Sequence, residues 1–181
     1  MAEQAERLRQ LIEDILDLSR LEAGSPTPLT PISLNRAVEQ VMSVHLIRAE
    51  ENDLALTFTP GANLPPVMAD PHRLTQVITN LVANAINYTP GGGVTVRTYW
   101  EPERSQVCLE VQDTGMGISA DTQAHLFERF YRGIDPNKQD IPGSGLGLAI
   151  VKDIVDSFHG QIEVKSEVGR GSVFKVWLPV A

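Results

Sequence analysis

Residues 70–90 read DPHRLTQVITNLVANAINYTP, with apolar side chains recurring at steps of three and four. This spacing predicts an amphipathic helix over residues 71–88, because residues three and four apart share one face of a helix. The apolar positions are Leu74, Val77, Ile78, Leu81, Val82, Ala85 and Ile86. The helix is therefore expected to pack this stripe against a core.

The opposite face of the same helix is polar and rich in asparagine. It carries Arg73, Gln76, Asn80, Asn84 and Asn87 at steps of three and four. A solvated face is one explanation, but asparagine is a poor helix former that competes with its own backbone. An amide oxygen can bind Mg²⁺ while the amide NH₂ donates to a phosphate oxygen. The three asparagines therefore favour a phosphate-binding or metal-binding stripe over a plain solvent face.

A turn with two glycines follows the strand predicted over residues 106–112. It reads Asp113-Thr114-Gly115-Met116-Gly117-Ile118. Glycine lets the backbone approach a flat ring, and a fixed carboxylate can accept a hydrogen bond from an exocyclic amine such as that of adenine. Turns of this composition also end strands that bind nothing, so the motif taken alone leaves both readings open.

Residues 143–150 read GSGLGLAI and lead into a further predicted helix. A glycine-rich turn at a helix N-terminus presents N–H groups and the positive end of the helix dipole to an anion. A flexible hinge would explain the same residues. The turn lacks the Gly-Lys-Ser/Thr ending of a Walker loop, and it does not directly follow a strand as a dinucleotide-binding turn does.

Periodicity and turn residues predict the remaining elements. Helices are expected over residues 4–22, over 34–51 with Ser33 as N-cap, over a short stretch near 120–127 and over 145–158. Strands are expected over residues 54–59, 93–101, 106–112, 161–166 and 172–179. The proline-rich residues 24–31 predict an extended linker. Because helices and strands do not alternate strictly, the fold is predicted to be α+β and not doubly wound.

Composition excludes several classes of protein. The 181 residues are 42% hydrophobic and 21% charged, which is typical of a soluble globular domain. The net charge of −8 argues against a nucleic-acid partner but leaves a local phosphate site open. No apolar stretch is long enough to span a bilayer, so no direct membrane contact is expected. Cys108 lies in an alternating run and is expected to be buried in a strand.

Five motifs in this order resemble the Bergerat-type ATPase domain of sensor histidine kinases. Residues 70–90 resemble the N box of that family, 113–118 the G1 box, 126–132 (LFERFYR) the F box, 143–148 the G2 box, and 169–174 (GRGSVF) the final glycine motif. The resemblance covers almost the whole chain. It implies a two-layer α/β sandwich, with a mixed sheet and helices on one face, preceded by an N-terminal helix.

The resemblance also implies ATP and Mg²⁺ as ligands and assigns roles to particular residues. Asn84 would hold Mg²⁺, Asn80 would touch the phosphates or the metal shell, and Asp113 would bind the adenine amine. Tyr88 would lie along the base, and Arg132 would reach the triphosphate. Asn80, Asn84 and Arg132 are thus the expected catalytic residues. The other positions implied to bind nucleotide are Asn87, Gly115, Gly117, Ile118, Lys138, Gly143, Ser144, Gly145, Leu146, Gly147 and Leu148. Residues 132–144 would form a lid.

Two positions depart from the family pattern. Many members carry Lys or Arg where this chain has Asn87, and that cation helps to neutralise phosphate charge. Lys138 or Arg132 would have to compensate. The family often reads His-Gly-Gly after the penultimate helix, whereas this chain has a single glycine after His159, so this histidine is expected to be structural.

The same resemblance divides the chain into three parts. Residues 1–23 resemble part of the second helix of a dimerisation and phosphotransfer hairpin, residues 24–31 are the linker, and residues 32–181 are the ATP-binding catalytic domain. None of His45, His72, His125 and His159 has the sequence context of the family's phosphoacceptor. The acceptor is therefore expected on a hairpin domain outside this chain. The resemblance further implies a cytoplasmic location, a homodimeric parent and a response regulator as partner.

Three other functions on related folds remain as alternatives. ATP hydrolases of the gyrase, chaperone and mismatch-repair type carry a Glu one helical turn before the metal-binding Asn, where this chain has Asn80. An amide cannot take a proton from water, which favours phosphoryl transfer to another protein. The F box and the hairpin-like helix favour a histidine kinase over a serine kinase of the anti-sigma type. An inactive nucleotide-binding module stays open because of Asn87.

Overall fold

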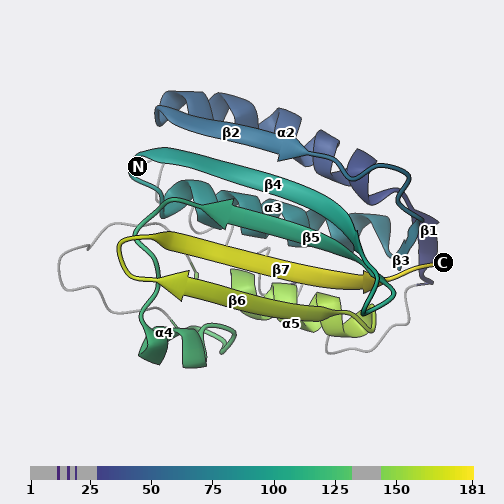
Figure 1. Cartoon of the computed structure of the whole chain (residues 1–181). Helices are drawn as coiled ribbons and strands as arrows, with labels where there is room; N and C mark the ends of the chain where they lie inside the picture. Colours follow the sequence, from purple (N-terminus) through teal and green to yellow (C-terminus); the bar gives the residue numbers. More distant parts are fainter. Residues whose placement is uncertain (1–11, 13–15, 17–18, 20–27, 132–143) are drawn as a thin grey trace.

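The computed structural model describes residues 12, 16, 19, 28–131 and 144–181. Ile12, Leu16 and Ser19 are helical, and the rest of the helix predicted over residues 4–22 lies outside the described residues. Figure 1 shows two layers, with a sheet in front and helices behind it. None of the helices in the described ranges is long and apolar enough to cross a membrane.

The sheet has five strands in the order β2-β4-β5-β7-β6. They are β2 (Leu54–Thr59), β4 (Gly92–Glu101), β5 (Gln106–Asp113), β6 (Gln161–Glu167) and β7 (Gly171–Pro179). β2 pairs with β4 in parallel and the other neighbours are antiparallel, so the sheet is mixed as predicted. At the end of the central strand, Asp113 lies opposite Val94 on one side and Ser172 on the other.

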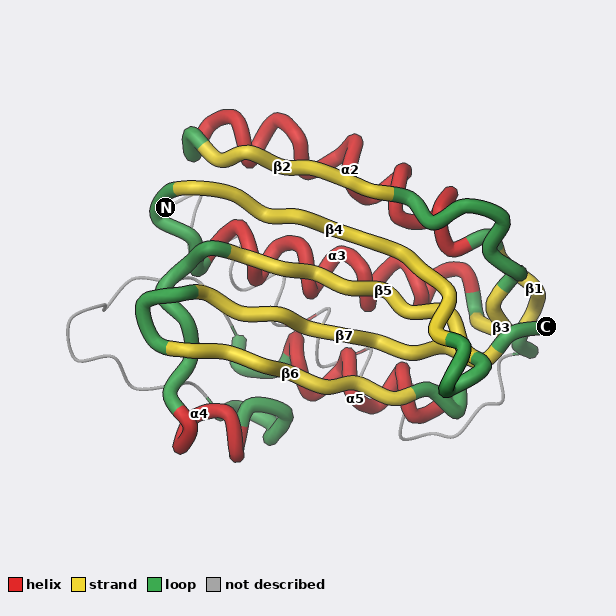
Figure 2. Tube along the Cα trace, viewed as in Figure 1, coloured by secondary structure: helices red, strands yellow, loops and turns green. Residues whose placement is uncertain are grey.

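Three helices cover one face of this sheet (Figures 1 and 2). They are α2 (Leu34–Glu51), α3 (Pro71–Asn87) and α5 (Gly147–Ser157). All seven apolar residues of the predicted α3 stripe are buried. They pack with the inward-facing residues of the strands, such as Val107, Leu109 and Val111 of β5. The core thus lies between the layers, which confirms the α+β sandwich with helices on one face.

Side-chain caps mark where α2 and α3 begin. The Ser33 hydroxyl accepts a hydrogen bond from the N–H of Arg36 at 3.5 Å, as expected of an N-cap. The Asp70 carboxylate accepts one from the N–H of Arg73 at 2.8 Å, and Pro71 occupies the first turn. The polar stripe of α3 therefore starts from a fixed point in the sequence.

A second, two-stranded sheet was not predicted. β1 (Thr30–Ile32) pairs antiparallel with β3 (Val67–Ala69). Val67 also forms a bridge to Val180, and the N–H of Ala181 donates to the Pro66 carbonyl at 2.9 Å. The last two residues of the predicted linker therefore belong to β1, while residues 24–27 lie outside the described ranges.

Two elements near the glycine turn differ from the sequence prediction. The helix predicted over residues 145–158 begins at Gly147, because Gly145 has a φ of +73° and so cannot belong to a right-handed helix. The short helix α4 (Ala120–His125) ends two residues earlier than expected. Figure 1 places α4 beyond the β6 edge of the sheet.

Candidate functional site

The asparagine face of α3 meets the start of α5. The Asn80 amide donates to the Gly147 carbonyl at 3.4 Å, so the predicted helix stripe and the predicted glycine turn are neighbours. A Cβ at Gly147 would lie 3.8 Å from the Asn80 side chain. Asn84 is half-buried, and its side chain makes no hydrogen bond with the described part of the chain. This partly buried amide is therefore available to a ligand.

Asp113 is a buried carboxylate held by backbone donors. Its side chain is at the end of β5 and the residue is only 5% exposed. Oδ1 accepts hydrogen bonds from the N–H of Gly115 at 2.8 Å and of Ser172 at 3.3 Å. Burial raises the pKa of Asp113 above its usual 3.8, although these hydrogen bonds act in the opposite direction. The geometry fixes this acceptor in a poorly solvated place.

The turn after β5 packs directly on the end of α3. A Cβ at Gly115 would lie 2.2 Å from the Tyr88 carbonyl oxygen, so only glycine fits there. The N–H of Met116 donates to the same oxygen at 3.2 Å. Tyr88 itself is 41% exposed. The turn that starts at Asp113 therefore packs against the backbone of Tyr88.

The loop between β6 and β7 supports this turn from the other side. Gly117 has a φ of +69°, and a Cβ there would lie 1.9 Å from the Glu167 carbonyl oxygen. The N–H of Ile118 donates to the Ser166 hydroxyl at 2.7 Å. A Cβ at Gly171 would lie 2.1 Å from the Asp113 carbonyl oxygen. Ile118 packs against the core, so its side chain is a packing residue.

Two supporting residues were absent from the predicted site. Ser172 holds Asp113 through its N–H, and its hydroxyl lies 2.9 Å from that of Ser166. The glycine motif at residues 169–174 was a recognisable signal in the sequence. That signal did not show that the motif reaches Asp113, because the contact depends on the pairing of β5 with β7.

The glycine turn before α5 is shaped by a close approach to Phe130. A Cβ at Gly145 would lie 3.0 Å from the Phe130 carbonyl carbon, and the Phe130 N–H donates to the Gly145 carbonyl at 2.9 Å. The N–H of Leu146 donates to the Ser144 hydroxyl at 3.2 Å. Leu146 is fully buried and Leu148 packs on the core, so their side chains serve packing. Any contact of this turn with an anion would therefore come from its backbone N–H groups or from the Ser144 hydroxyl.

Asn87, at the end of the polar stripe, has a basic neighbour. The Arg48 guanidinium of α2 donates to its amide oxygen at 2.7 Å. The sequence did not reveal this contact, since the two residues are 39 positions apart. Arg132, Lys138 and Gly143 lie outside the described residues, as does the predicted lid up to residue 143.

These residues fit a magnesium nucleotide better than a free metal ion. The described residues contain no cluster of three His, Cys, Asp or Glu side chains that would hold a metal by themselves. Mg²⁺ keeps several waters and takes much of its coordination from substrate phosphates, so one amide oxygen such as that of Asn84 suffices. The buried carboxylate of Asp113 suits a neutral amine donor, since a raised pKa marks a site with poor solvation of charge.

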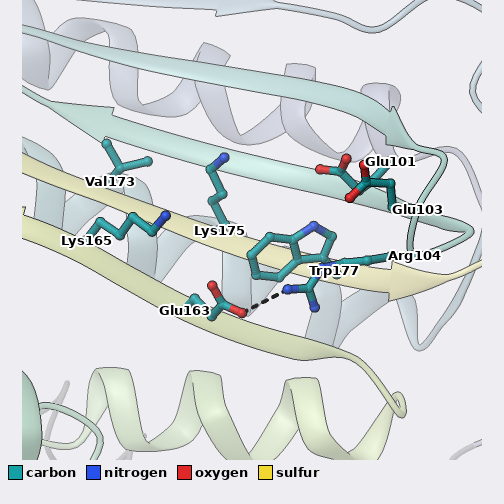
Figure 3. Close-up of a pocket in the computed structure, with 8 residues that line it drawn as sticks. All are labelled: Glu101, Glu103, Arg104, Glu163, Lys165, Val173, Lys175 and Trp177. Carbon is teal, nitrogen blue, oxygen red and sulfur yellow. Dashed lines mark hydrogen bonds and ion pairs between the residues drawn. The ribbon is translucent and has the colours of Figure 1, made fainter.

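A separate hollow of about 200 Å³ lies on the sheet face away from the helices (Figure 3). Its lining consists of Glu101, Glu103, Arg104, Glu163, Lys165, Val173, Lys175 and Trp177. Arg104 bonds to Glu163 at 3.0 Å and stacks over Trp177 at 4.1 Å. Lys175 pairs with Glu110 at 3.2 Å. Two of the three cations, Arg104 and Lys175, are therefore paired within the protein. The hollow is a weaker candidate for an anion site than the glycine turn at the start of α5.

Comparisons with known proteins identify the family of the chain. The family model described as "Histidine kinase-, DNA gyrase B-, and HSP90-like ATPase" matches residues 69–181. The circadian input-output histidine kinase CikA of Synechococcus elongatus is 39% identical over 178 residues, covering 96% of this chain and 23% of that protein. The probable sensor histidine kinase TcrY of Mycobacterium tuberculosis is 40% identical over 182 residues, covering 99% and 37%.

A solved structure is similar over nearly the whole chain. ShkA, crystallised at full length in complex with AMPPNP, superimposes with a TM-score of 0.86 at 31% identity. The match covers 99% of this chain and 37% of ShkA. The chain thus spans between 23% and 37% of the length of these three proteins.

Proposed function

Because the chain belongs to the family of histidine kinase-, DNA gyrase B- and HSP90-like ATPases, with sensor histidine kinases as relatives, we propose that it transfers the γ-phosphoryl group of ATP to a histidine of a separate hairpin domain. Its fold is that of the ATP-binding catalytic domain of such kinases. The observation that carries the proposal is a buried acceptor, Asp113, placed by one turn beside the end of an asparagine-lined helix.

Adenine recognition falls to Asp113. The carboxylate accepts a hydrogen bond from the exocyclic amine of the base, while Gly115 lets the turn lie close against Tyr88. Tyr88 is exposed enough to cover one side of the base. Because the carboxylate is buried and held by two N–H groups, it is oriented before the base arrives.

The phosphates lie between α3 and the start of α5. Asn84 would supply an amide oxygen to Mg²⁺, whose positive charge would offset the negative charge of the phosphates. Asn80 and the backbone of the turn before Gly147 orient the phosphate chain. Asn80 lies next to this turn, because its amide donates to the Gly147 carbonyl. These residues position and stabilise charge, and none of them forms a covalent bond.

The nucleophile is an imidazole nitrogen of the hairpin domain. Its lone pair forms a bond to the γ-phosphorus as the bond from phosphorus to the β,γ-bridging oxygen breaks. ADP leaves with the electron pair, and the proton of the imidazole passes to water. A hydrolase needs a base to activate water, and Asn80 is an amide that cannot take that proton.

Of the chain's four histidines, His72 is exposed at the start of α3, and the other three have structural surroundings. His45 is 8% exposed in α2, and burial is the main cause of its lowered pKa. His125 bonds to Glu128 at 2.7 Å, and His159 has a φ of +58° just after α5. This left-handed residue caps the helix, in agreement with the structural role expected for it. The acceptor is therefore proposed to lie on the hairpin of the parent kinase.

The selectivity of the chain for ATP over GTP tests the proposal. The chain should bind ATP, whose amine donates to Asp113, and should bind GTP much more weakly, because guanine presents a carbonyl oxygen at the same position. Asp113→Asn supplies an amide that can donate to the guanine carbonyl, so the difference between the affinities for ATP and GTP should become smaller. Asp156→Ala, at an exposed position in α5, is the matched control. Equal affinities for ATP and GTP in the parent chain would refute the assignment of Asp113.

A further inference from the structure

Arg48 extends from α2 to the end of the asparagine stripe on α3. One guanidinium nitrogen donates to the Asn87 amide oxygen at 2.7 Å. Within the described residues, Arg48 forms no ion pair with a carboxylate. Arginine has five N–H donors in a fixed fork, so donors remain for another acceptor.

Stability alone does not account for this placement. A hydrogen bond between two exposed side chains contributes little to folding, since both groups are well solvated when apart. The other role for a basic residue in the last turn of a helix is to bind the terminal carbonyls. Here the Asn52 side chain donates to the Arg48 carbonyl at 2.6 Å, and the Asn52 N–H donates to the Ala49 carbonyl at 3.1 Å. The guanidinium is directed instead to another helix.

The phosphate side of the proposed site needs positive charge. Its described α3 residues, Asn80, Asn84 and Asn87, are neutral, and the chain carries a net charge of −8. A triphosphate and the charge that develops during phosphoryl transfer require cationic partners in addition to the metal. Asn87 is three residues from Asn84, so their Cβ atoms are about 5–6 Å apart on one helix face. A guanidinium bonded to Asn87 is therefore close to the amide proposed to hold Mg²⁺.

We propose that Arg48 is a phosphate-binding residue of the nucleotide site, and that Asn87 is the positioning residue that holds its guanidinium over the stripe. The inference rests on the proposed function, since it assigns one more contact to the same ligand. The planar fork of Arg48 suits the oxygens of a phosphate, which it binds through two parallel N–H groups.

The test compares ligands with and without phosphates. Arg48→Gln should weaken the binding of the nonhydrolysable analogue AMPPNP by about tenfold, the cost of one charge-assisted hydrogen bond, and leave adenosine binding unchanged. In phosphorylation of a hairpin domain, the variant should raise KM for ATP. Arg36→Gln, an exposed substitution on the same helix, is the control. Circular dichroism would establish that each variant is folded.

A second variant separates binding from structure. Arg48→Gln combined with Asn87→Lys places a cation on the same stripe and should restore AMPPNP affinity, whereas a purely structural bond between the two side chains would not be rescued. An AMPPNP affinity of Arg48→Gln within twofold of the parent would overturn the inference while leaving the proposed function intact. A parent chain that binds no adenine nucleotide would end both proposals.

Discussion

Asp113 is a carboxylate whose surroundings suit a neutral hydrogen-bond donor. It is 5% exposed, and the N–H groups of Gly115 and Ser172 fix its orientation. Burial disfavours its charged form and raises its pKa, which costs folding stability at pH values above the raised pKa. An acceptor kept at such a cost is typical of a functional site.

The raised pKa predicts how nucleotide binding depends on pH. Protonated Asp113 has lost the charge that makes it a strong acceptor for the adenine amine, and protonation starts at a higher pH than for a solvent-exposed Asp. ADP affinity should therefore fall on acidification before an ordinary Asp would titrate. Isotherms measured between pH 8 and pH 4 on the parent and on Asp113→Asn would show this. Identical pH profiles for the two proteins would contradict the assignment.

Asn84 is expected to account for the metal dependence of binding. Its side chain is half-buried and has no partner in the described part of the chain. Asn84→Ala removes the amide oxygen proposed to bind Mg²⁺, so ATP should bind this variant equally with the metal or with a chelator. Thr75→Ala, an exposed change on the same helix, should keep the parent's dependence. A parent chain that binds ATP equally with and without Mg²⁺ would exclude this role.

At the scale of elements, the contact between the turn after β5 and the end of α3 joins the proposed adenine-binding residue Asp113 to the helix that carries the asparagine stripe. The turn after Asp113 lies so close to the end of α3 that a Cβ at Gly115 would stand 2.2 Å from the Tyr88 carbonyl oxygen. The contact is between backbones, so a rotamer change cannot relieve it. Separation of these two elements would move Asp113 and Tyr88 apart.

Gly115→Ala should therefore reduce both stability and nucleotide binding. Overpacking costs typically about 1–3 kcal/mol, and the backbone shift that relieves it would misplace Asp113. Gly91→Ala is the matched control, because a Cβ at Gly91 would have nothing within 4 Å. Urea denaturation and ADP isotherms would measure the two effects. A Gly115→Ala protein as stable as Gly91→Ala, with unchanged affinity, would contradict the described packing.

The elements found from sequence are those with long, regular patterns. The boundaries of α2 and β2 agree with prediction, because Ser33 caps the helix and the residues of the strand alternate. β1 and β3 were missed, since three residues are too few to show a period and Pro31 within β1 resembled a linker residue. The pairing that creates them joins segments far apart in sequence.

As with the fold, the parts of the candidate site that lie in local motifs were predicted, and those that depend on long-range contacts were not. Asp113, Gly115 and Asn80 were recognised from local motifs, and the structure brings Asp113 against Gly115 and Asn80 against Gly147. Ser172 and Arg48 were not recognised, because their contacts arise from strand pairing and helix packing. Motifs predicted which segments form the site, and the tertiary contacts added the Ser172 N–H, which holds Asp113, and the Arg48 guanidinium, which donates to Asn87.

At the scale of the whole molecule, the two layers serve different purposes. One sheet face is covered by α2, α3 and α5 (Figure 1). The proposed nucleotide site uses residues of α3, the start of α5 and the turn after β5. The opposite face carries a polar network in which Glu110 bonds to Arg97 at 2.7 Å and to Tyr99 at 3.1 Å. Burial opposes ionisation of Glu110, but these partners and Lys175 outweigh it and lower its pKa. Three cations of this face, Arg97, Arg104 and Lys175, are therefore paired with carboxylates of the protein.

Phosphoryl transfer requires a group that this domain is not proposed to supply. The chain spans 23% of CikA and 37% of TcrY, and we propose that the acceptor lies on a hairpin domain of a longer parent kinase. The contribution proposed for this chain is to bind ATP and to orient the γ-phosphate, and positioning accounts for much of the catalysis in this chemistry. A covalent link to the hairpin would raise the effective concentration of the acceptor.

Labelling in trans would show whether the chain phosphorylates a histidine of a separate hairpin domain. The chain is incubated with Mg²⁺ and ATP labelled in the γ-phosphate, alone and with the hairpin domain of the parent kinase or its acceptor His→Gln variant. We predict acid-labile, base-stable label on the hairpin histidine only, at a low rate, with slow phosphate release from the chain alone. Label on His45, His72, His125 or His159, or rapid phosphate release without an acceptor, would contradict it.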